Sequence, residues 1–126
     1  MNSATYVSGS MQEGVLVLSI LVEKLRDPET AYALRDEIMS QVDASETRDL
    51  VLDMKRVESV GSVGFLSFLS VRRHLADGNI VLCNLSDPVR ETFQISRLIS
   101  ADSSQIAPFI AASTVDAALE KLSNGG

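Results

Sequence analysis

Few side chains in this chain could do chemistry, and the most conspicuous is a serine in a Gly-Ser-Val-Gly stretch. Ser62 lies between Gly61 and Gly64, where an apolar run gives way to helical spacing. Hydrolases place a serine nucleophile in a similar strand–turn–helix, but their pattern is Gly-x-Ser-x-Gly. The single histidine, His74, is expected about three helical turns away, too far to act as its base. We therefore expect no catalytic residue.

Metal and cofactor sites are not expected either. One histidine and one cysteine cannot supply the usual zinc ligand set. The chain has no glycine loop followed by lysine, and the glycines around Ser62 lack dinucleotide-binding spacing. Cys83 ends the apolar run 80–83, which predicts a small buried hydrophobic residue in a reducing compartment. His74 is expected to be a solvated helix residue.

Composition restricts the class of partner. The 126 residues carry a net charge of −6, with 45% hydrophobic and 5% aromatic residues and no tryptophan. Such a charge repels nucleic acid and anionic lipid, so neither is an expected partner. The first ten residues lack a secretory signal, and the apolar run 15–22 is too short to span a membrane. We expect one cytoplasmic domain over residues 1–126, without membrane insertion.

The order of elements predicts an α/β fold. Residues 50–54 are apolar up to their end, which is typical of a central strand covered on both faces. We expect a polar turn at 11–14, an irregular connection at 96–104 and a frayed tail at 123–126. The expected elements are strands at 5–10, 15–22, 50–54, 80–83 and 109–111, and helices beginning near Asp27, Val63, Ser86 and Ser113. This order predicts a mixed, mostly parallel sheet of four to five strands with about four helices packed on it.

Helix starts and helix faces give more specific predictions. Asp27 should cap the first helix, with Pro28 at its first position. The apolar stripe of that helix consists of Ala31, Leu34, Ile38 and Val42. In the second helix the apolar face consists of Phe65, Phe68, Leu69, Val71 and Leu75. Asp77, Gly78 and Asn79 should end this second helix, with the glycine just beyond its last turn.

The start of the second helix presents a candidate binding surface. Val63 and Leu66 lie off its apolar face, beside Ser67 and Ser70. Aliphatic and small residues in this arrangement form a shallow patch suited to another protein. Alternatively, Val63 and Leu66 pack beneath neighbouring loops, and the sequence leaves both interpretations open. The predicted partner-binding residues are Ser59, Gly61, Ser62, Val63, Gly64, Leu66 and Ser67.

Ser62 has two interpretations of its own. A serine at a helix start commonly caps free backbone amides. The same place favours negative charge, so Ser62 is also a phosphorylation candidate, with Ser59 as the second. A phosphate there would put about two negative charges into the apolar patch and dislodge a partner.

The chain as a whole resembles the STAS domain family of anti-sigma factor antagonists and related bacterial switch proteins. The residues that carry the resemblance are 50–54, 57, 60–65, 79–84, 88–93, 109–110 and 115–119. The resemblance implies a small mixed sheet with helices on it, in agreement with the order of elements. It also implies a phosphoacceptor serine or threonine directly before a glycine, in an Asp-Ser/Thr-Ser-Gly turn.

The expected acceptor position falls on Val63, and the turn's aspartate falls on Gly61. Because valine cannot be phosphorylated, three alternatives follow. Ser62 or Ser59 has taken over as acceptor, the protein is held in the partner-competent state, or its regulation lies elsewhere, for instance in its concentration.

The functional hypothesis is a non-enzymatic switch protein that docks an anti-sigma serine kinase or phosphatase through residues 59–66. The alternative is a STAS subunit of a larger assembly, such as a lipid-transport ATPase or a stressosome-like complex. A small hydrolase that uses Ser62 ranks last. A homo-oligomer and a small-ligand pocket are left open.

Overall fold

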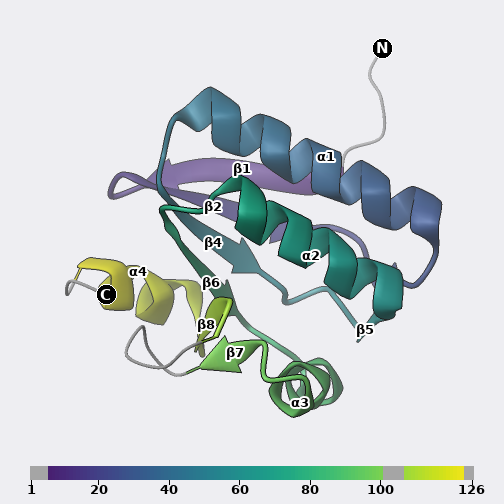
Figure 1. Ribbon diagram of the computed structural model, residues 1–126. Coiled ribbons are helices and arrows are strands. Elements are labelled where there is room, and N and C mark those ends of the chain that lie inside the picture. Colours follow the sequence, from purple (N-terminus) through teal and green to yellow (C-terminus); the bar gives the residue numbers. More distant parts are fainter. Residues whose placement is uncertain (1–5, 101–106, 124–126) are drawn as a thin grey trace.

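A mixed six-stranded sheet forms the centre of the computed structural model, which describes residues 6–100 and 107–123 (Figure 1). Its strands, in spatial order, are β1 (Val7–Gln12), β2 (Val15–Ile20), β4 (Asp49–Asp53), β6 (Asn79–Cys83), β8 (Phe109–Ala112) and β7 (Ile99–Ser100). Only the β1–β2 pair is antiparallel within this sheet. The expected mostly parallel sheet is confirmed, with β7 as a strand that the sequence did not reveal.

Four helices pack on this sheet, as expected. They are α1 (Pro28–Ser45), α2 (Ser62–His74), α3 (Asp87–Ile95) and α4 (Val115–Ser123). Figure 1 shows α1 and α2 side by side over one face of the sheet, α4 on the opposite face, and α3 at the end near β7. None of the helices in the two described segments is long and apolar enough to cross a membrane.

The core consists of two layers that meet at β4. Leu50 and Leu52 point into the layer beneath α1 and α2, whereas Val51 points toward α4. All three are fully buried, as predicted for a continuous apolar strand. The first layer also contains Leu34, Ile38 and Val42 of the predicted stripe of α1, and Ala31 of that stripe is buried as well. The rings of Phe65 and Phe93 meet edge to face between α2 and α3, with their centres 4.8 Å apart.

The start of α1 matches the sequence prediction. Asp27 accepts a hydrogen bond from the backbone N–H of Thr30 at 2.9 Å, and Pro28 is the first helical residue. This hydrogen bond to the ionised carboxylate holds the pKa of Asp27 below its usual value. The cap therefore contributes stability at neutral pH that is lost as the pH falls through the pKa of the folded state.

Three boundary predictions are corrected. The β1–β2 turn is only Glu13 and Gly14, both with positive φ, so Met11 and Gln12 belong to β1. Thr114 rather than Ser113 caps α4, since its hydroxyl accepts from the N–H of Ala117 at 3.1 Å. Helix α4 includes Ser123; the rest of the predicted frayed tail, like Thr5 and residues 101–104 of the predicted connection, lies outside the described residues.

Gly78 has a different role from the predicted helix terminator. Helix α2 ends at His74, and Gly78 lies in the turn before β6. A Cβ on Gly78 would lie 1.5 Å from the carbonyl oxygen of Arg48, so this glycine is required because two backbone segments nearly touch.

We predict that Cys83 resists alkylation in the native protein. Burial and, secondarily, the charge of Asp53 raise the pKa of its thiol to about 12, and the thiolate is the reactive form. Mass spectrometry after iodoacetamide treatment at mildly alkaline pH should find unmodified protein, whereas protein in concentrated guanidinium chloride should be fully labelled. Rapid labelling without denaturant would contradict the burial of Cys83.

Candidate functional site

The candidate site is the corner between β4 and α2, and a second, two-stranded sheet fixes its position. Strands β3 (Lys24–Leu25) and β5 (Ser59–Val60) pair in parallel. The N–H of Gly61 continues this pairing by donating to the carbonyl of Leu25 at 2.8 Å. The segment that joins β4 to α2 is therefore held by hydrogen bonds to a segment more than thirty residues earlier.

Gly64 allows α2 to begin directly on this small sheet. A Cβ at Gly64 would come within 2.7 Å of Val60 Cγ1 and 3.0 Å of the Leu25 carbonyl oxygen. At Gly61 the nearest neighbour of such a Cβ, Arg26 Cα, is 3.5 Å away, which is ordinary contact. The close packing at the start of α2 therefore requires glycine at Gly64 but not at Gly61.

The predicted cap at Ser62 is wrong. Gly61 is the N-cap residue, and Ser62 is the exposed first residue of α2, where its hydroxyl does not cap the helix. The first turn, residues 62–65, contains no acidic side chain. The first amides of a helix lack helical acceptors and carry partial positive charge. An exposed hydroxyl thus lies where the helix favours a negative charge.

Val63 and Leu66 were expected either to form an exposed patch or to pack beneath neighbouring loops, and their exposure distinguishes between these alternatives. Leu66 is 58% exposed, and Val63 is half-buried and belongs to neither core layer. Ser67, expected on the same surface, is only 4% exposed, because its hydroxyl donates to the carbonyl of Ala31 on α1 at 3.0 Å. Leu66 is therefore available to a partner and Ser67 is not.

Leu66 also borders a groove that the sequence did not reveal. The groove, of about 810 Å³, lies between α1, α2 and residues 107–108. Tyr32 of α1, 44% exposed, faces Leu66 and Leu69 of α2 across it. Arg72 donates to the carbonyls of Gly78 at 2.6 Å and Pro108 at 3.3 Å, which fixes one wall. In the sequence, Tyr32 directly follows Ala31 of the buried α1 stripe, and this position indicates that Tyr32 is exposed. The sequence does not indicate that Tyr32 lies close to Leu66 and Leu69 of α2.

Ser59 is less accessible than Ser62. It lies half-buried in β5 and lines a small hollow of about 220 Å³ between that strand and α3, together with Glu58 and Val89. Of the two phosphorylation candidates, Ser62 is therefore the exposed one.

The structure does not bring His74 to Ser62. The two residues lie at opposite ends of α2, about 18 Å apart by helix rise. His74 Nε2 is 2.8 Å from Asp43 Oδ1, so the His74 side chain links α2 to α1 through this contact. Within residues 6–100 and 107–123, no group of three histidine, cysteine or acidic side chains could hold a metal ion.

Comparison with known proteins agrees with this architecture. The sequence pattern of the family described as the STAS domain matches residues 12–112. BtrV of Bordetella bronchiseptica, assigned as an anti-sigma factor antagonist, is 40% identical over 72 residues, which cover 56% of this chain and 61% of BtrV. The matched part is thus less than two thirds of that relative.

Solved structures show the same fold. An anti-sigma factor antagonist from Mycobacterium paratuberculosis has a TM-score of 0.71 and 25% identity, over 90% of both chains. The phosphorylated form of the Bacillus cell fate determinant SpoIIAA has a TM-score of 0.62 and 21% identity, over 92% of this chain and 98% of that one.

We predict that Gly64→Ala destabilises the protein by about 1–3 kcal/mol, because the new methyl group meets a backbone carbonyl and a stiff valine. Gly61→Ala is the matched control and should cost less than about 1 kcal/mol. Urea unfolding of both variants measures the difference. Equal loss of stability in the two variants would contradict the close packing assigned to Gly64.

Proposed function

This chain belongs to the STAS domain family, and we propose that it is an anti-sigma factor antagonist that docks a serine kinase or phosphatase of its own pathway. The docking surface consists of Ser59, Gly61, Ser62, Val63 and Leu66. Gly64, which was predicted to belong to it, is buried against Leu25 and Val60 and is left out, as Ser67 is. The observation that carries the proposal is the exposure of Leu66 on a backbone corner that is held by β3 and β5. The proposed function involves no catalysis by this chain and takes place in the cytoplasm.

Energetics favour this surface as a docking site. Burying one exposed leucine side chain gains about 1.5–3 kcal/mol, enough to make it an anchor. The corner is already ordered by the Gly61–Leu25 hydrogen bond, so binding would cost little conformational entropy there. Small neighbouring residues allow a partner's backbone to approach closely.

The groove beside Leu66 indicates the chemistry of the partner segment. Tyr32 and Leu69 give the groove apolar surface, and Arg35 and Arg73 add positively charged side chains to its lining. The Arg35 guanidinium lies over the Tyr32 ring, 5.0 Å from its centre, in a cation–π contact. The two side chains together form a continuous part of the groove wall. A partner helix or loop with an apolar anchor flanked by a carboxylate would complement it.

Regulation is assigned to Ser62. Its hydroxyl is exposed, and its place in the first turn of α2 favours a phosphate. A phosphate on Ser62 would lie one helical turn from Leu66 and would oppose apolar docking. Val63, which falls on the family's acceptor position, cannot take this role, and Ser59 is half-buried.

The first test measures binding to the anti-sigma-type serine kinases of the same genome by isothermal titration calorimetry. We expect Leu66→Asp to weaken binding by about 2 kcal/mol, or about 30-fold, since it places a charge in a desolvated contact. Val63→Asp should weaken binding in the same direction.

Met11→Asp is the matched control, since Met11 is similarly exposed, at 51%, on β1. Binding by none of the kinases, or an equal loss in the Leu66 and Met11 variants, would contradict the proposal. Constant co-migration with a large assembly in size-exclusion chromatography would favour the subunit alternative instead.

The second test is the intact mass of the protein after incubation with such a kinase and ATP. We expect one added phosphate in the wild type and none in Ser62→Ala, with Ser59→Ala unchanged from wild type. A phosphate that persists in Ser62→Ala would contradict the assignment of the acceptor.

A further inference from the structure

Strand β1 forms an open edge of the main sheet. It pairs with β2 on one side, and none of the described strands pairs with its other side. Figure 1 shows β1 at the margin of the sheet, with α1 over its face. Six residues, Val7–Gln12, are therefore available for pairing along this edge.

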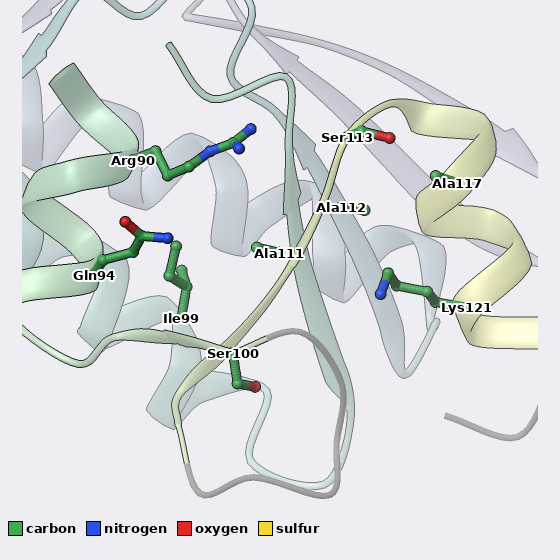
Figure 2. Close-up of a pocket in the computed structure, with 9 residues that line it drawn as sticks. All are labelled: Arg90, Gln94, Ile99, Ser100, Ala111, Ala112, Ser113, Ala117 and Lys121. Atoms are coloured by element: carbon green, nitrogen blue, oxygen red, sulfur yellow. The ribbon is translucent and has the colours of Figure 1, made fainter. Parts of the chain in front are cut away.

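The opposite edge of the sheet is protected. Its last strand, β7, has only two residues, Ile99 and Ser100. Figure 2 shows Gln94 of α3 beside Ile99, and both residues line one hollow. A strand this short, flanked by a helix, offers little backbone to another chain. Of the two edges, β1 is the one that is open to pairing.

The usual protection of an edge strand is missing from β1. Proteins discourage pairing at an edge with charged residues, proline, bulges or a covering element. Residues 7–12 contain no charged side chain and no proline, and their register with β2 runs without a bulge. All of them except Val7 are exposed. In a chain of net charge −6, this uncharged edge allows two copies to meet with little direct like-charge repulsion.

The register of the β1–β2 hairpin determines which backbone groups face outward. The turn has two residues, so the pair that flanks it is hydrogen-bonded, and such pairs alternate along an antiparallel ladder. The N–H of Leu21 donates to the carbonyl of Tyr6 at 2.8 Å, as this alternation requires. The even-numbered residues of β1 therefore bond to β2. The residues whose N–H and carbonyl groups point away from β2 are Val7, Gly9 and Met11.

These outward groups match those of a second β1 in antiparallel orientation. With Gly9 opposite Gly9 of the second copy, Val7 lies opposite Met11 and Met11 lies opposite Val7. All three outward residues then form hydrogen-bonded pairs. A shift of this register by two residues in either direction leaves one of the three without a partner in residues 7–12. The arrangement has twofold symmetry, the commonest symmetry of homodimers.

The side chains are matched in the same register. Val7 belongs to the core layer beneath α1, and Met11, four residues later on the strand, points to the same face. Met11, 51% exposed, would lie beside Val7 of the second copy. On the other face Ser8 would lie opposite Ser10, whose hydroxyl accepts from the Gln12 side chain at 3.2 Å and keeps its own proton to donate.

We propose that two copies of this chain pair through β1, antiparallel and with Gly9 on the twofold axis. The two main sheets then become one continuous sheet. This interface goes beyond the proposed function, because β1 shares no residue with the docking surface.

Sedimentation equilibrium at protein concentrations from micromolar to millimolar tests the proposal. We expect a monomer–dimer equilibrium for the wild type. Met11→Asp should weaken the dimer about tenfold or more, because it puts a charge on the paired edge. Met11→Pro removes an outward N–H and none that bonds to β2, so it should weaken the dimer in the same way. Circular dichroism verifies that each variant is folded.

Leu66→Asp is the matched control, because it adds the same charge at an exposed position away from β1. It should dimerise as the wild type does while losing kinase binding, and Met11→Asp should show the reverse. The two proposals can therefore fail independently. A wild type that stays monomeric, growth into larger species instead of dimers, or equal weakening by the Leu66 and Met11 variants would overturn the proposed interface.

Disulfide formation between copies tests the register. Ser8 and Ser10 of different copies would form a non-hydrogen-bonded pair, with Cα atoms about 4.5 Å apart, which suits a disulfide. Ser8→Cys and Ser10→Cys proteins, mixed and mildly oxidised, should form covalent dimers about tenfold faster than either protein alone, since identical positions lie about 7–8 Å apart. Intact mass measures the covalent dimer. Equal rates in the mixture and in the separate proteins, or no covalent dimer, would overturn the proposed pairing.

Discussion

The carbonyl group of Leu25 is the point on which the candidate site depends. It accepts the N–H of Gly61 at 2.8 Å, and it lies so close to Gly64 that a Cβ there would approach it to 3.0 Å. One backbone atom thus sets both the end of β5 and the distance of α2 from β3. Because the hydrogen bond and the glycine contact act together, the first turn of α2 has little freedom to shift.

This constraint determines which side chains of α2 are buried in the core and which are exposed to solvent. Phe68 and Val71 are buried in the core layer, and Ser67 is hydrogen-bonded to α1. With that orientation fixed, Leu66 must point outward beside Tyr32. The exposed leucine is therefore a consequence of how the helix is packed, and the proposed partner surface needs no rearrangement to form. A switch based on charge at Ser62 would act on this preformed surface.

The sequence predicted elements with strong periodicity and missed those that depend on distant backbone. The apolar stripe of α1, its Asp27 cap and the doubly buried β4 follow from local patterns, and all are found. Strands of two residues, such as β3 and β5, carry no such pattern and exist only because two distant segments meet. For the same reason Ser67 looked polar and exposed, although its acceptor on α1 lies thirty-six residues earlier. The corner itself was identified by Gly61 and Gly64, but only contacts show which glycine is required.

Hydrogen exchange of the chain alone and in the presence of the anti-sigma-type kinase that is proposed as its partner tests the central claim most directly. In the free protein the amide of Gly61 should exchange slowly, because it is bonded to Leu25. Complex formation should add protection to peptides that cover residues 59–66 and leave those of α4 unchanged. Rapid exchange at Gly61, or added protection confined to α4, would contradict the account.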